Sequence, residues 1–525
     1  MGQQLKIPQQ KQANPKQNQD TARYIFHTIQ QKETFFSVSQ KYHVQPMDIM
    51  EANPGLTIET FQINKNIRIP IDLANNEIEQ EKPAEINYAE YKIGKRETMY
   101  SITRKFNIAQ AELLKLNPGL RNGLKEGTVI RIPSAEQSPA SSVPSSLTER
   151  EANALLAAQA KISRPDTIKL ALLLPFTADE NTSSSNIAHF IEYYEGLLLA
   201  VDSMQKRGVP QVMKLTVRDT GNGIKKLLDI LKEKELEEAH LIIGGIDNEQ
   251  IALIGAFAQR NQIRYAIPFS SRNDEVQANA SILQVNTPHS YLLSQAAQIA
   301  YSIFRDHNII FIDTRDADDK ADFIKLAKQE FAQHNVAFRN LVYKEESFYA
   351  DLENLLRKDK RNLVIPASGK MESLMKIRPA LRQLAERTGI SVNLFGYPEW
   401  QTYTREIIDD FFFFDTYIYT NFYADNKSID LSRFNTKFWL WYGKIPNGFP
   451  KFGILGFDTG MFFLDAIARY GVNFENSFEK MNNRSLQTGF RFKRANNWGG
   501  FFNSSLFLVH YNKDNYKILW QEVKP

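Results

Sequence analysis

The pattern of hydrophobic and polar positions changes near residue 166. From there on, continuous apolar runs recur, at Ile168–Leu174, Leu215–Val217, Leu241–Ile243, Ile282–Val285, Ile309–Ile312, Leu363–Ile365 and Val392–Phe395. Helical periodicity lies between some of them, at Ile191–Met204, Lys225–Lys234 and Asp322–Phe331. Buried runs that alternate with amphipathic helices are typical of parallel sheets covered by helices. We predict two α/β lobes in this region, because it is too long for a single sheet.

The chain before residue 135 is different, because one segment occurs twice. Residues 33–56 and 97–120 align without a gap, and both copies close with Ile-Arg-Ile-Pro, at Ile67–Pro70 and Ile130–Pro133. Each copy reads as an extended stretch, two short helices, an Asn-Pro-Gly stop and a closing strand. Since a repeat defines the unit of structure, we predict two β-α-α-β modules, each with two antiparallel strands.

The motifs of the two copies resemble those of LysM modules. Copy one carries Glu33–Val38, Asn53–Leu56 and Ile67–Pro70, and copy two carries Glu97–Ile102, Asn117–Leu120, Leu124–Gly127 and Ile130–Pro133. LysM modules bind glycans that contain N-acetylglucosamine, such as peptidoglycan and chitin, so the resemblance implies such a partner. Two features depart from the family pattern. The glycine before Glu-Thr is replaced by Lys32 and Arg96, and Asn64 stands near the place of Gly127. We expect copy two to be the better binder.

In the LysM family the glycan lies between the first loop and the turn after the second helix. An N-acetyl group needs one hydrogen-bond donor, one acceptor and an apolar pocket for its methyl. The resemblance implies glycan contacts from Thr34, Phe35, Asn53, Pro54, Gly55 and Leu56 in copy one, and from Glu97, Thr98, Met99, Tyr100, Asn117, Pro118, Gly119 and Leu120 in copy two. The alternative is that Asn-Pro-Gly only ends a helix, and that Leu56 and Leu120 belong to the core.

Composition suggests where the segments begin and end. Residues 1–22 are rich in Gln and poor in large apolar side chains, which is typical of a disordered tether. We expect module 1 at residues 23–71, a linker at 72–89 and module 2 at 90–134. A Ser/Pro-rich linker with a short Ala-rich helix is expected at 135–165, followed by the two-lobed domain at 166–525.

The sequence gives no sign of catalysis. The chain has no Cys, which excludes a thiol nucleophile and a Cys-ligated zinc site. Its eight His show no H-E-x-x-H spacing, and neither a G-x-S-x-G elbow nor a Walker loop occurs. A glycosidase needs only two carboxylates, which the sequence leaves open. We expect a non-catalytic protein without cofactor or metal. The net charge of +4 gives no indication of nucleic-acid binding.

The compartment is predicted from the repeats rather than from a targeting signal. No run approaches the ~18 apolar residues of a membrane-spanning helix, and residues 1–6 lack the apolar region of a signal peptide. Either the chain is cytosolic or it is a mature chain behind an initiating Met. The LysM resemblance favours the periplasm or cell envelope of a bacterium, and a lipoprotein anchor is one candidate tether.

A series of local motifs runs through residues 166–525. They are Ile168–Phe176, Tyr194–Gly196, Ala200–Asp202, Val217–Thr220, Ile242–Gly245, Ala266–Ser271, Gly456–Met461 and Thr488–Asn503. Their order resembles type 1 periplasmic binding proteins, such as branched-chain amino-acid receptors. The resemblance implies a two-lobed α/β domain with its ligand cleft at the carboxyl ends of the strands. The fold class we predict is therefore α/β, with two small LysM modules and this larger domain.

Polar residues after the predicted strands are the candidates for a cleft ligand. They are Asn248, Ser270, Ser271, Thr287, Ser368 and Glu399. In amino-acid receptors, hydroxyls and backbone amides hold the carboxylate, and an acidic residue near the position of Glu399 holds the ammonium. Asp247 does not suit a carboxylate ligand, so an ordinary amino-acid site is in doubt. The alternative for each candidate is a loop cap or a solvated polar side chain.

Two functions remain open for the large domain. The first is a scaffold or regulator of cell-wall or envelope machinery, held at the wall by the modules and docking an envelope protein. Aromatic residues concentrated between 400 and 450 are expected mainly in the core and on the surface that closes the lobes. The alternative is a surface that docks a partner protein. The alternative is a wall-anchored solute receptor that binds a small polar molecule, such as an amino acid or muropeptide, between the lobes.

Overall fold

The computed structural model describes most of the large domain and module 1, and parts of module 2. The described residues are 23–71, 88–94, 102, 113, 117, 120, 127–133, 149–157, 163–177, 184–316, 318–446, 448–481 and 485–523. The predicted tether at 1–22 and most of both linkers lie outside them. By their internal contacts the residues form two compact units, and segment Met50–Ile67 belongs to the unit that contains Leu155–Pro525.

Module 1 has the predicted β-α-α-β order. It consists of β1 (Tyr24–Thr28), α2 (Phe35–Lys41), α3 (Pro46–Ala52) and β2 (Asn66–Pro70). Backbone bonds join Ile29 to Lys65 and Ile71 to Arg23, so the two strands run antiparallel. The buried side chains come from both strand ends and both helices, and include Ile29, Phe35, Val38, Ile49, Leu56, Ile67 and Ile69. The repeat was therefore a reliable guide to this unit.

The described part of module 2 has the same frame. Strands β3 (Tyr88–Lys92) and β4 (Val129–Pro133) pair antiparallel, as predicted. Ile102, Leu113, Leu120 and Ile130 are buried. The Ala-rich stretch that follows contains α6 (Glu149–Ala157), which agrees with the helix predicted there.

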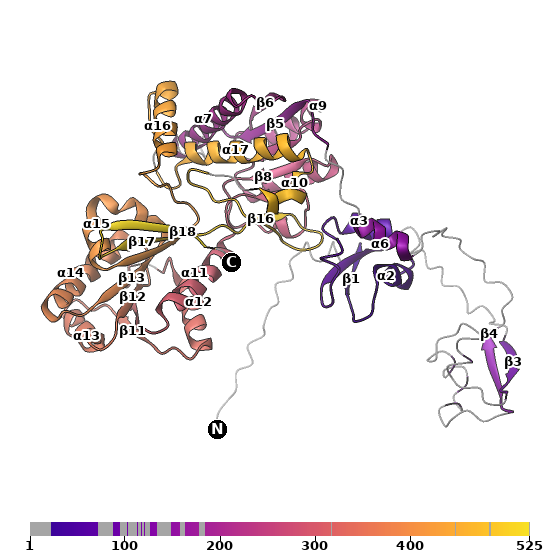
Figure 1. The fold of residues 1–525 in the computed structure, drawn as a ribbon, viewed down its shortest axis with the longest axis horizontal. Helices are drawn as coiled ribbons and strands as arrows, with labels where there is room; N and C mark the ends of the chain where they lie inside the picture. Colours follow the sequence, from indigo (N-terminus) through magenta and orange to yellow (C-terminus); the bar gives the residue numbers. More distant parts are fainter. Residues whose placement is uncertain are drawn as a thin grey trace. The chain divides into compact units, whose positions relative to one another are not determined.

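The large domain has two lobes, each built on a seven-stranded sheet (Figure 1). The sheet of lobe 1 has the order β15-β16-β9-β8-β7-β5-β6. Its strands are β5 (Thr167–Leu174), β6 (Val212–Asp219), β7 (Leu241–Gly244), β8 (Arg264–Ile267), β9 (Ile282–Gln284), β15 (Phe492–Arg494) and β16 (Phe501–Asn503). Strands β5 to β9 are parallel, and β15 and β16 form the predicted terminal hairpin.

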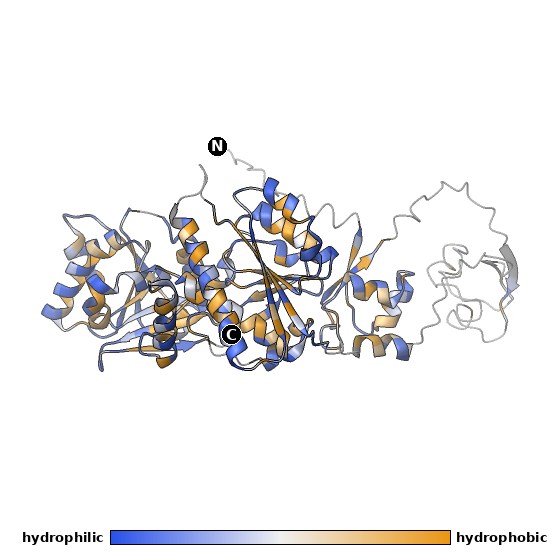
Figure 2. Cartoon of the chain, turned by 90° about the horizontal axis from the view of Figure 1, so that it is seen from above, coloured by the Kyte–Doolittle hydropathy of each residue, from blue (hydrophilic) through white to orange (hydrophobic). Residues whose placement is uncertain are grey.

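Lobe 2 has the strand order β11-β10-β12-β13-β14-β17-β18. The strands are β10 (Asn308–Asp313), β11 (Phe338–Val342), β12 (Asn362–Pro366), β13 (Val392–Gly396), β14 (Thr416–Thr420), β17 (Phe507–Asn512) and β18 (Lys517–Glu522). The first five are parallel, and β17 and β18 add an antiparallel edge. The central strands are apolar and the helices show one apolar side, as the hydropathy colours in Figure 2 make visible.

Helices cover both sheets. Those of lobe 1 are α7 (Ser184–Lys206), α8 (Lys225–Ile230), α9 (Lys234–Glu237), α10 (Asn248–Arg260), α16 (Ile429–Tyr442) and α17 (Phe452–Tyr470), with the short η3 (Glu275–Gln277) and η5 (Phe474–Lys480). Those of lobe 2 are α11 (His289–Phe304), α12 (Ala321–Gln333), α13 (Phe348–Leu355), α14 (Met371–Thr388) and α15 (Thr404–Phe413), with η4 (Pro398–Thr402). The helix predicted at Lys225–Lys234 is interrupted, because α8 ends at Ile230 and α9 starts at Lys234.

A seam of glycines lets α7 and α17 pack closely. A side chain on Gly196 would strike the backbone of Gly453, and one on Gly456 would strike the backbone of Tyr193. The two helices lie side by side across lobe 1 (Figure 1). The chain passes between the lobes three times, near residues 285–288, 421–428 and 504–506. The first and third crossings are tied together, because the Thr287 hydroxyl donates to the Ser505 carbonyl (2.9 Å).

Candidate functional site

The first loop of module 1 is organised around the start of α2. Thr34 caps this helix: its hydroxyl accepts from the Ser37 N–H (3.1 Å), and the Ser37 hydroxyl accepts from the Thr34 N–H (2.9 Å). The Phe35 side chain is buried in the module core. Both residues therefore have structural roles, and their contact with a glycan stays a prediction.

A charged network that the sequence did not indicate stands beside this loop. Glu33 accepts from the Lys41 ammonium (2.9 Å) and pairs with Nε2 of His27 (2.7 Å). The other ring nitrogen of His27 lies 3.0 Å from the Tyr42 hydroxyl. These contacts hold the loop before the Thr34 cap. Glu33 corresponds by the repeat to Glu97, so the duplication itself could have singled it out.

The turn after α3 is largely covered. Of the four predicted residues Asn53, Pro54, Gly55 and Leu56, only Pro54 is exposed. The Gly55 carbonyl accepts from the Thr60 hydroxyl (2.9 Å), and the Gly55 N–H donates to the Asn497 carbonyl (2.7 Å). The Asn497 side chain in turn donates to the Asn66 carbonyl (3.0 Å). The backbone groups expected to meet a glycan thus already have partners within the chain.

In module 2 the matching asparagine acts as a clamp. The Asn117 side-chain amide donates to the carbonyls of Leu113 (3.1 Å) and Arg131 (2.7 Å), and its oxygen accepts from the Arg131 N–H (2.7 Å). These bonds tie Leu113 and Asn117 to β4. Leu120 is buried. The other residues predicted here, Glu97, Thr98, Met99, Tyr100, Pro118 and Gly119, lie outside the described residues.

The departures from the family pattern fall on left-handed backbone. Lys32, which stands where the family has glycine, has φ of 71°. Asn64 has φ of 66° and Gly127 has φ of 84°. The Asn64 N–H donates to the carbonyl of Ile29, directly after β1, and the Gly127 N–H donates to the carbonyl of Ile93, directly after β3. Asn tolerates this conformation better than other non-Gly residues, whereas Lys is strained in it. Asn64 therefore keeps the closing turn intact, and the cost of the departure lies at Lys32.

The cleft candidates lie at the carboxyl ends of strands, but several serve the fold. Thr287 and Ser368 are buried, and Thr287 ties two crossings as described above. Asn248 accepts from the Asn273 amide (2.9 Å). Ser270 and Ser271 follow β8, and the Ser270 carbonyl accepts from Gln284 (3.2 Å). Asp247 caps α10 by accepting from the Gln250 N–H (2.9 Å). Ligand contacts by the six predicted residues stay a prediction.

Glu399 meets a cation of the same lobe. The Lys320 ammonium lies 2.5 Å from Oε1 of Glu399 and 3.4 Å from Asp319, above the Tyr397 ring. Burial alone would raise the pKa of Asp319, but hydrogen bonds from Ser368 and the Gly369 N–H, together with the Lys320 charge, hold it below its usual value. A lysine of the chain thus already pairs with both carboxylates of this acidic corner. The sequence did not single out Lys320, because it follows a different strand.

A second basic group, Arg272, follows β8 of lobe 1 and contacts His289 at the start of lobe 2. An Arg272 guanidinium nitrogen lies 2.9 Å from Nε2 of His289. Burial, and then the positive charge of Arg272, lower the pKa of His289, which favours a neutral ring that accepts this hydrogen bond. Arg272 follows directly after the two predicted serines, so this corner is more cationic than those hydroxyls alone indicate.

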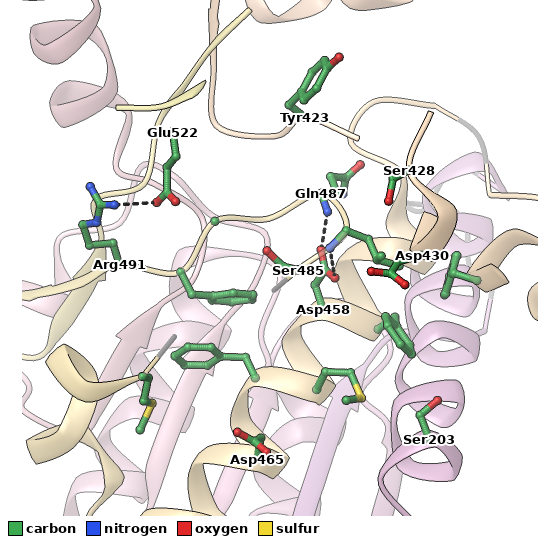
Figure 3. Close-up of a pocket in the computed structure, with 18 of the residues that line it drawn as sticks. Ser203, Tyr423, Ser428, Asp430, Asp458, Asp465, Ser485, Gln487, Arg491 and Glu522 are labelled. Carbon is green, nitrogen blue, oxygen red and sulfur yellow. Dashed lines mark hydrogen bonds and ion pairs between the residues drawn. The ribbon is translucent and has the colours of Figure 1, made fainter. Parts of the chain in front are cut away.

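A cavity of about 1200 Å³ is lined by none of the six predicted cleft residues. It is lined by α16, α17, η5 and the segments beside the crossings, and Figure 3 shows Asp458, Gln487 and the Arg491–Glu522 ion pair on its wall. Asp458 accepts from the backbone N–H groups of Leu486, Gln487 and Thr488. Burial raises the pKa of Asp458 to about 6 despite these bonds. The bonds fix the loop that follows η5, so this carboxylate has a structural task.

The described residues contain no group of three or more metal-ligating side chains. Among the same residues, no helix is both long and apolar enough to span a membrane.

Comparison with known proteins decides the nature of the repeats. The family model described as LysM domain matches residues 27–70 and again 91–133. The chain carries two LysM domains. The probable N-acetylmuramoyl-L-alanine amidase AmiB of Haemophilus influenzae is 30% identical over 129 residues, which cover 19% of this chain. The match is confined to the LysM region and spans only 30% of that amidase.

The solved structures that match cover the large domain. A branched-chain amino acid ABC transporter protein from Rhodospirillum rubrum is 15% identical, with a TM-score of 0.48 over 67% of this chain and all of that chain. A branched-chain amino acid ABC transporter periplasmic ligand-binding protein from Burkholderia xenovorans is 12% identical, with a TM-score of 0.45 over 68% of this chain and 95% of that one. The predicted fold class, with two LysM modules and a two-lobed α/β domain, is confirmed.

Proposed function

We propose that the protein is a non-catalytic envelope protein, held on peptidoglycan by its LysM domains, whose large domain is a scaffold or regulator of cell-wall machinery. The two LysM matches support the glycan and the bacterial periplasm or cell envelope. The observation that carries the choice of scaffold is the Lys320–Glu399 pair, because the one acidic corner predicted to hold a ligand's ammonium already holds a lysine.

The exposed end of α16 supports a protein partner. Trp439, Leu440, Trp441 and Ile445 are each about half exposed or more. Such large apolar side chains are seldom left together in water without a use, and Trp is enriched at the centres of protein interfaces. Figure 1 shows α16 projecting from the edge of lobe 1, where an envelope protein could reach it.

A wall-anchored solute receptor is the second candidate. It is supported by Ser270 and Ser271 at the carboxyl end of β8, where ligands bind in parallel α/β sheets. Arg272 beside them adds a cation that would suit a carboxylate. An amino acid would have to compete with Lys320 for Glu399, whereas an acidic ligand without an ammonium group would not.

Two measurements test the proposal. The full chain is mixed with purified sacculi and sedimented, beside a chain that starts at residue 163 and lacks both LysM domains. We expect only the full chain to be retained, and equal sedimentation would refute wall binding. Thermal unfolding is then followed with single amino acids and muropeptides. A receptor gains stability as its ligand exceeds Kd, so a rise with any of them would favour the receptor over the scaffold.

A further inference from the structure

The turn of the first LysM domain is held by a loop of the large domain. This loop, Ala495–Gly500, joins β15 to β16 and lies in the same compact unit as segment Met50–Ile67. Its Asn497 is nearly buried, with 9% of its surface exposed. It makes the two hydrogen bonds described above, one accepted from the Gly55 N–H and one donated to the Asn66 carbonyl.

The chemistry of this contact matches that of an N-acetyl sugar. The acetamido group of N-acetylglucosamine offers one carbonyl acceptor and one N–H donor. Asn497 offers a backbone carbonyl and a side-chain N–H to the same kind of backbone partners. Gly55 and Asn66 come from the turn after α3 and from the start of β2. The turn is the part of the module that the LysM resemblance assigns to the glycan.

The loop is shaped before it meets the turn. The Asn496 side chain accepts from the N–H groups of Trp498 and Gly499 and donates to the Gln277 carbonyl (2.9 Å). Arg494 donates to the Gly499 carbonyl (2.8 Å) and stacks over the Phe501 ring. A loop fixed by its own bonds loses little entropy when it docks, so its contact is stronger than that of a floppy segment.

We propose that the loop Ala495–Gly500 is an internal stand-in for the glycan, which occupies the turn of the first LysM domain until an N-acetylated glycan displaces it. This inference rests on the proposed glycan binding of that domain. The polar part of the contact consists of two neutral hydrogen bonds, each of modest net strength, and the Arg494 side chain lies against Gly55 beside them. A ligand that replaces both hydrogen bonds can therefore compete with the loop. Binding to the wall would then release the tip of the β15–β16 hairpin.

The β15–β16 hairpin lies next to the crossings between the lobes, so its release would affect the large domain. Strand β16 ends at Asn503, directly before the third crossing between the lobes. The Asn503 side chain donates to the carbonyls of Val285, at the first crossing, and Gly489. The segment freed by the glycan is therefore continuous with the crossing segments that join the lobes, so we expect wall binding to loosen the junction between the two lobes.

The test uses the full chain and an isosteric variant. Asn497→Asp keeps the shape of the side chain but sets a carboxylate against the Asn66 carbonyl, and it alters no residue assigned to the glycan. Asn515→Asp is the control, since it adds the same charge in the β17–β18 turn and keeps the oxygen that accepts from Lys517. Equal melting temperatures of the two variants show that the fold is intact.

Hydrogen exchange and affinity are measured with tetra-N-acetylchitotetraose. In the parent chain, we expect the sugar to protect Met50–Ile67 and to speed exchange in 494–500. Asn497→Asp should show fast exchange in 494–500 without sugar and bind it about tenfold more tightly than the control. Protection of Met50–Ile67 without any change in 494–500, or equal affinities, would overturn the stand-in. If the sugar protects no amide in residues 23–71 and sacculi do not retain the chain, the proposed glycan binding itself is refuted.

Discussion

The turn of the first LysM domain and the acidic corner of the cleft are both satisfied by the chain itself, but through different chemistry. At the turn, Asn497 gives neutral hydrogen bonds to backbone groups. At the corner, the Lys320 ammonium pairs with Glu399 and Asp319. A neutral amide can be exchanged for the amide of a sugar at little net cost. A cation can be replaced only by another cation, and its removal leaves carboxylates facing each other.

This difference separates the two proposals. The turn stays open to its predicted ligand, because the ligand carries the groups that Asn497 now supplies. The corner is closed to an ordinary amino acid, because an incoming ammonium has to displace one that is covalently attached. We therefore expect the LysM domain to be the regulated binding site and the cleft corner to be a structural element of lobe 2.

The largest effect is expected from breaking the corner. Lys320→Met leaves Glu399 and Asp319 without their cation, and since the groups are partly exposed the loss should be about 1–2 kcal/mol of unfolding free energy. The freed carboxylate should then accept an ammonium, so leucine should raise the melting temperature of the variant and not that of the parent. Lys325→Met, an exposed position on α12, is the control. A parent chain that responds to leucine as strongly would show that Lys320 does not block the site.

Gly55→Ala should break the contact between the turn and Asn497 by steric overlap. The expected loss is about 1 kcal/mol in the free energy of this contact, which is smaller than the effect at the corner. Gly55 does not need a positive φ, so Ala fits its backbone, but the added methyl carbon would meet Arg494 and lie 2.9 Å from the Asn497 carbonyl. Gly55→Ala should speed hydrogen exchange in 494–500 while the melting temperature of the large domain stays the same. Pro54→Ala, on the exposed neighbour, should leave that exchange slow. Slow exchange in both variants would mean that the loop does not depend on the turn.

Much of this frame could be predicted from local patterns. All seven apolar runs lie on strands, and six of these strands are largely buried, because strands buried on both faces leave a continuous apolar signature. The seventh, β6, is an edge strand whose side chains are mostly half-buried or exposed. The repeat likewise predicted β3 and β4 from β1 and β2. The glycine seam between α7 and α17 was missed, since Gly196 and Gly453 are far apart in sequence and neither marks its partner.

The pairing of Glu399 with Lys320 and of the turn with Asn497 could not be predicted from local sequence patterns for the same reason. Glu399 was singled out because it follows β13, but Lys320 follows β10, and only the parallel sheet brings the two strand ends together. Asn497 stands in a loop of turn-forming residues, where nothing distinguishes it from its neighbour Asn496. The sequence could name the groups that might bind a ligand, but not the distant residues that already occupy them.

A substitution in the first loop, on the other side of the predicted glycan groove, leaves the contact between the turn and Asn497 unchanged. Lys32 has a left-handed φ of 71° that glycine adopts without strain. Lys32→Gly should therefore stabilise the first LysM domain by about 0.5–1 kcal/mol, after allowing for the greater freedom of glycine in the unfolded chain. Asn64→Gly should gain less, because Asn already tolerates this region. Hydrogen exchange of the β1 and α2 amides in the full chain measures the stability change in both variants. A larger stabilisation by Asn64→Gly than by Lys32→Gly would contradict the assignment of the backbone strain to Lys32.

Lowering the pH should have different effects on the turn contact and on the acidic corner, and these are the smallest effects that we predict. The folded-state pKa of Asp319 lies below its usual value of 3.8, so its ionised form contributes stability above that value and loses it as the pH falls through the lowered pKa. The bonds of Asn497 involve no titrating group. Between pH 7 and pH 4, hydrogen exchange corrected for its intrinsic pH dependence should stay constant both in 494–500 and around Gly369. Below pH 3.8, protection around Gly369 should fall first. Loss of the turn contact at a higher pH than the corner would show that charge, not neutral hydrogen bonding, holds the turn.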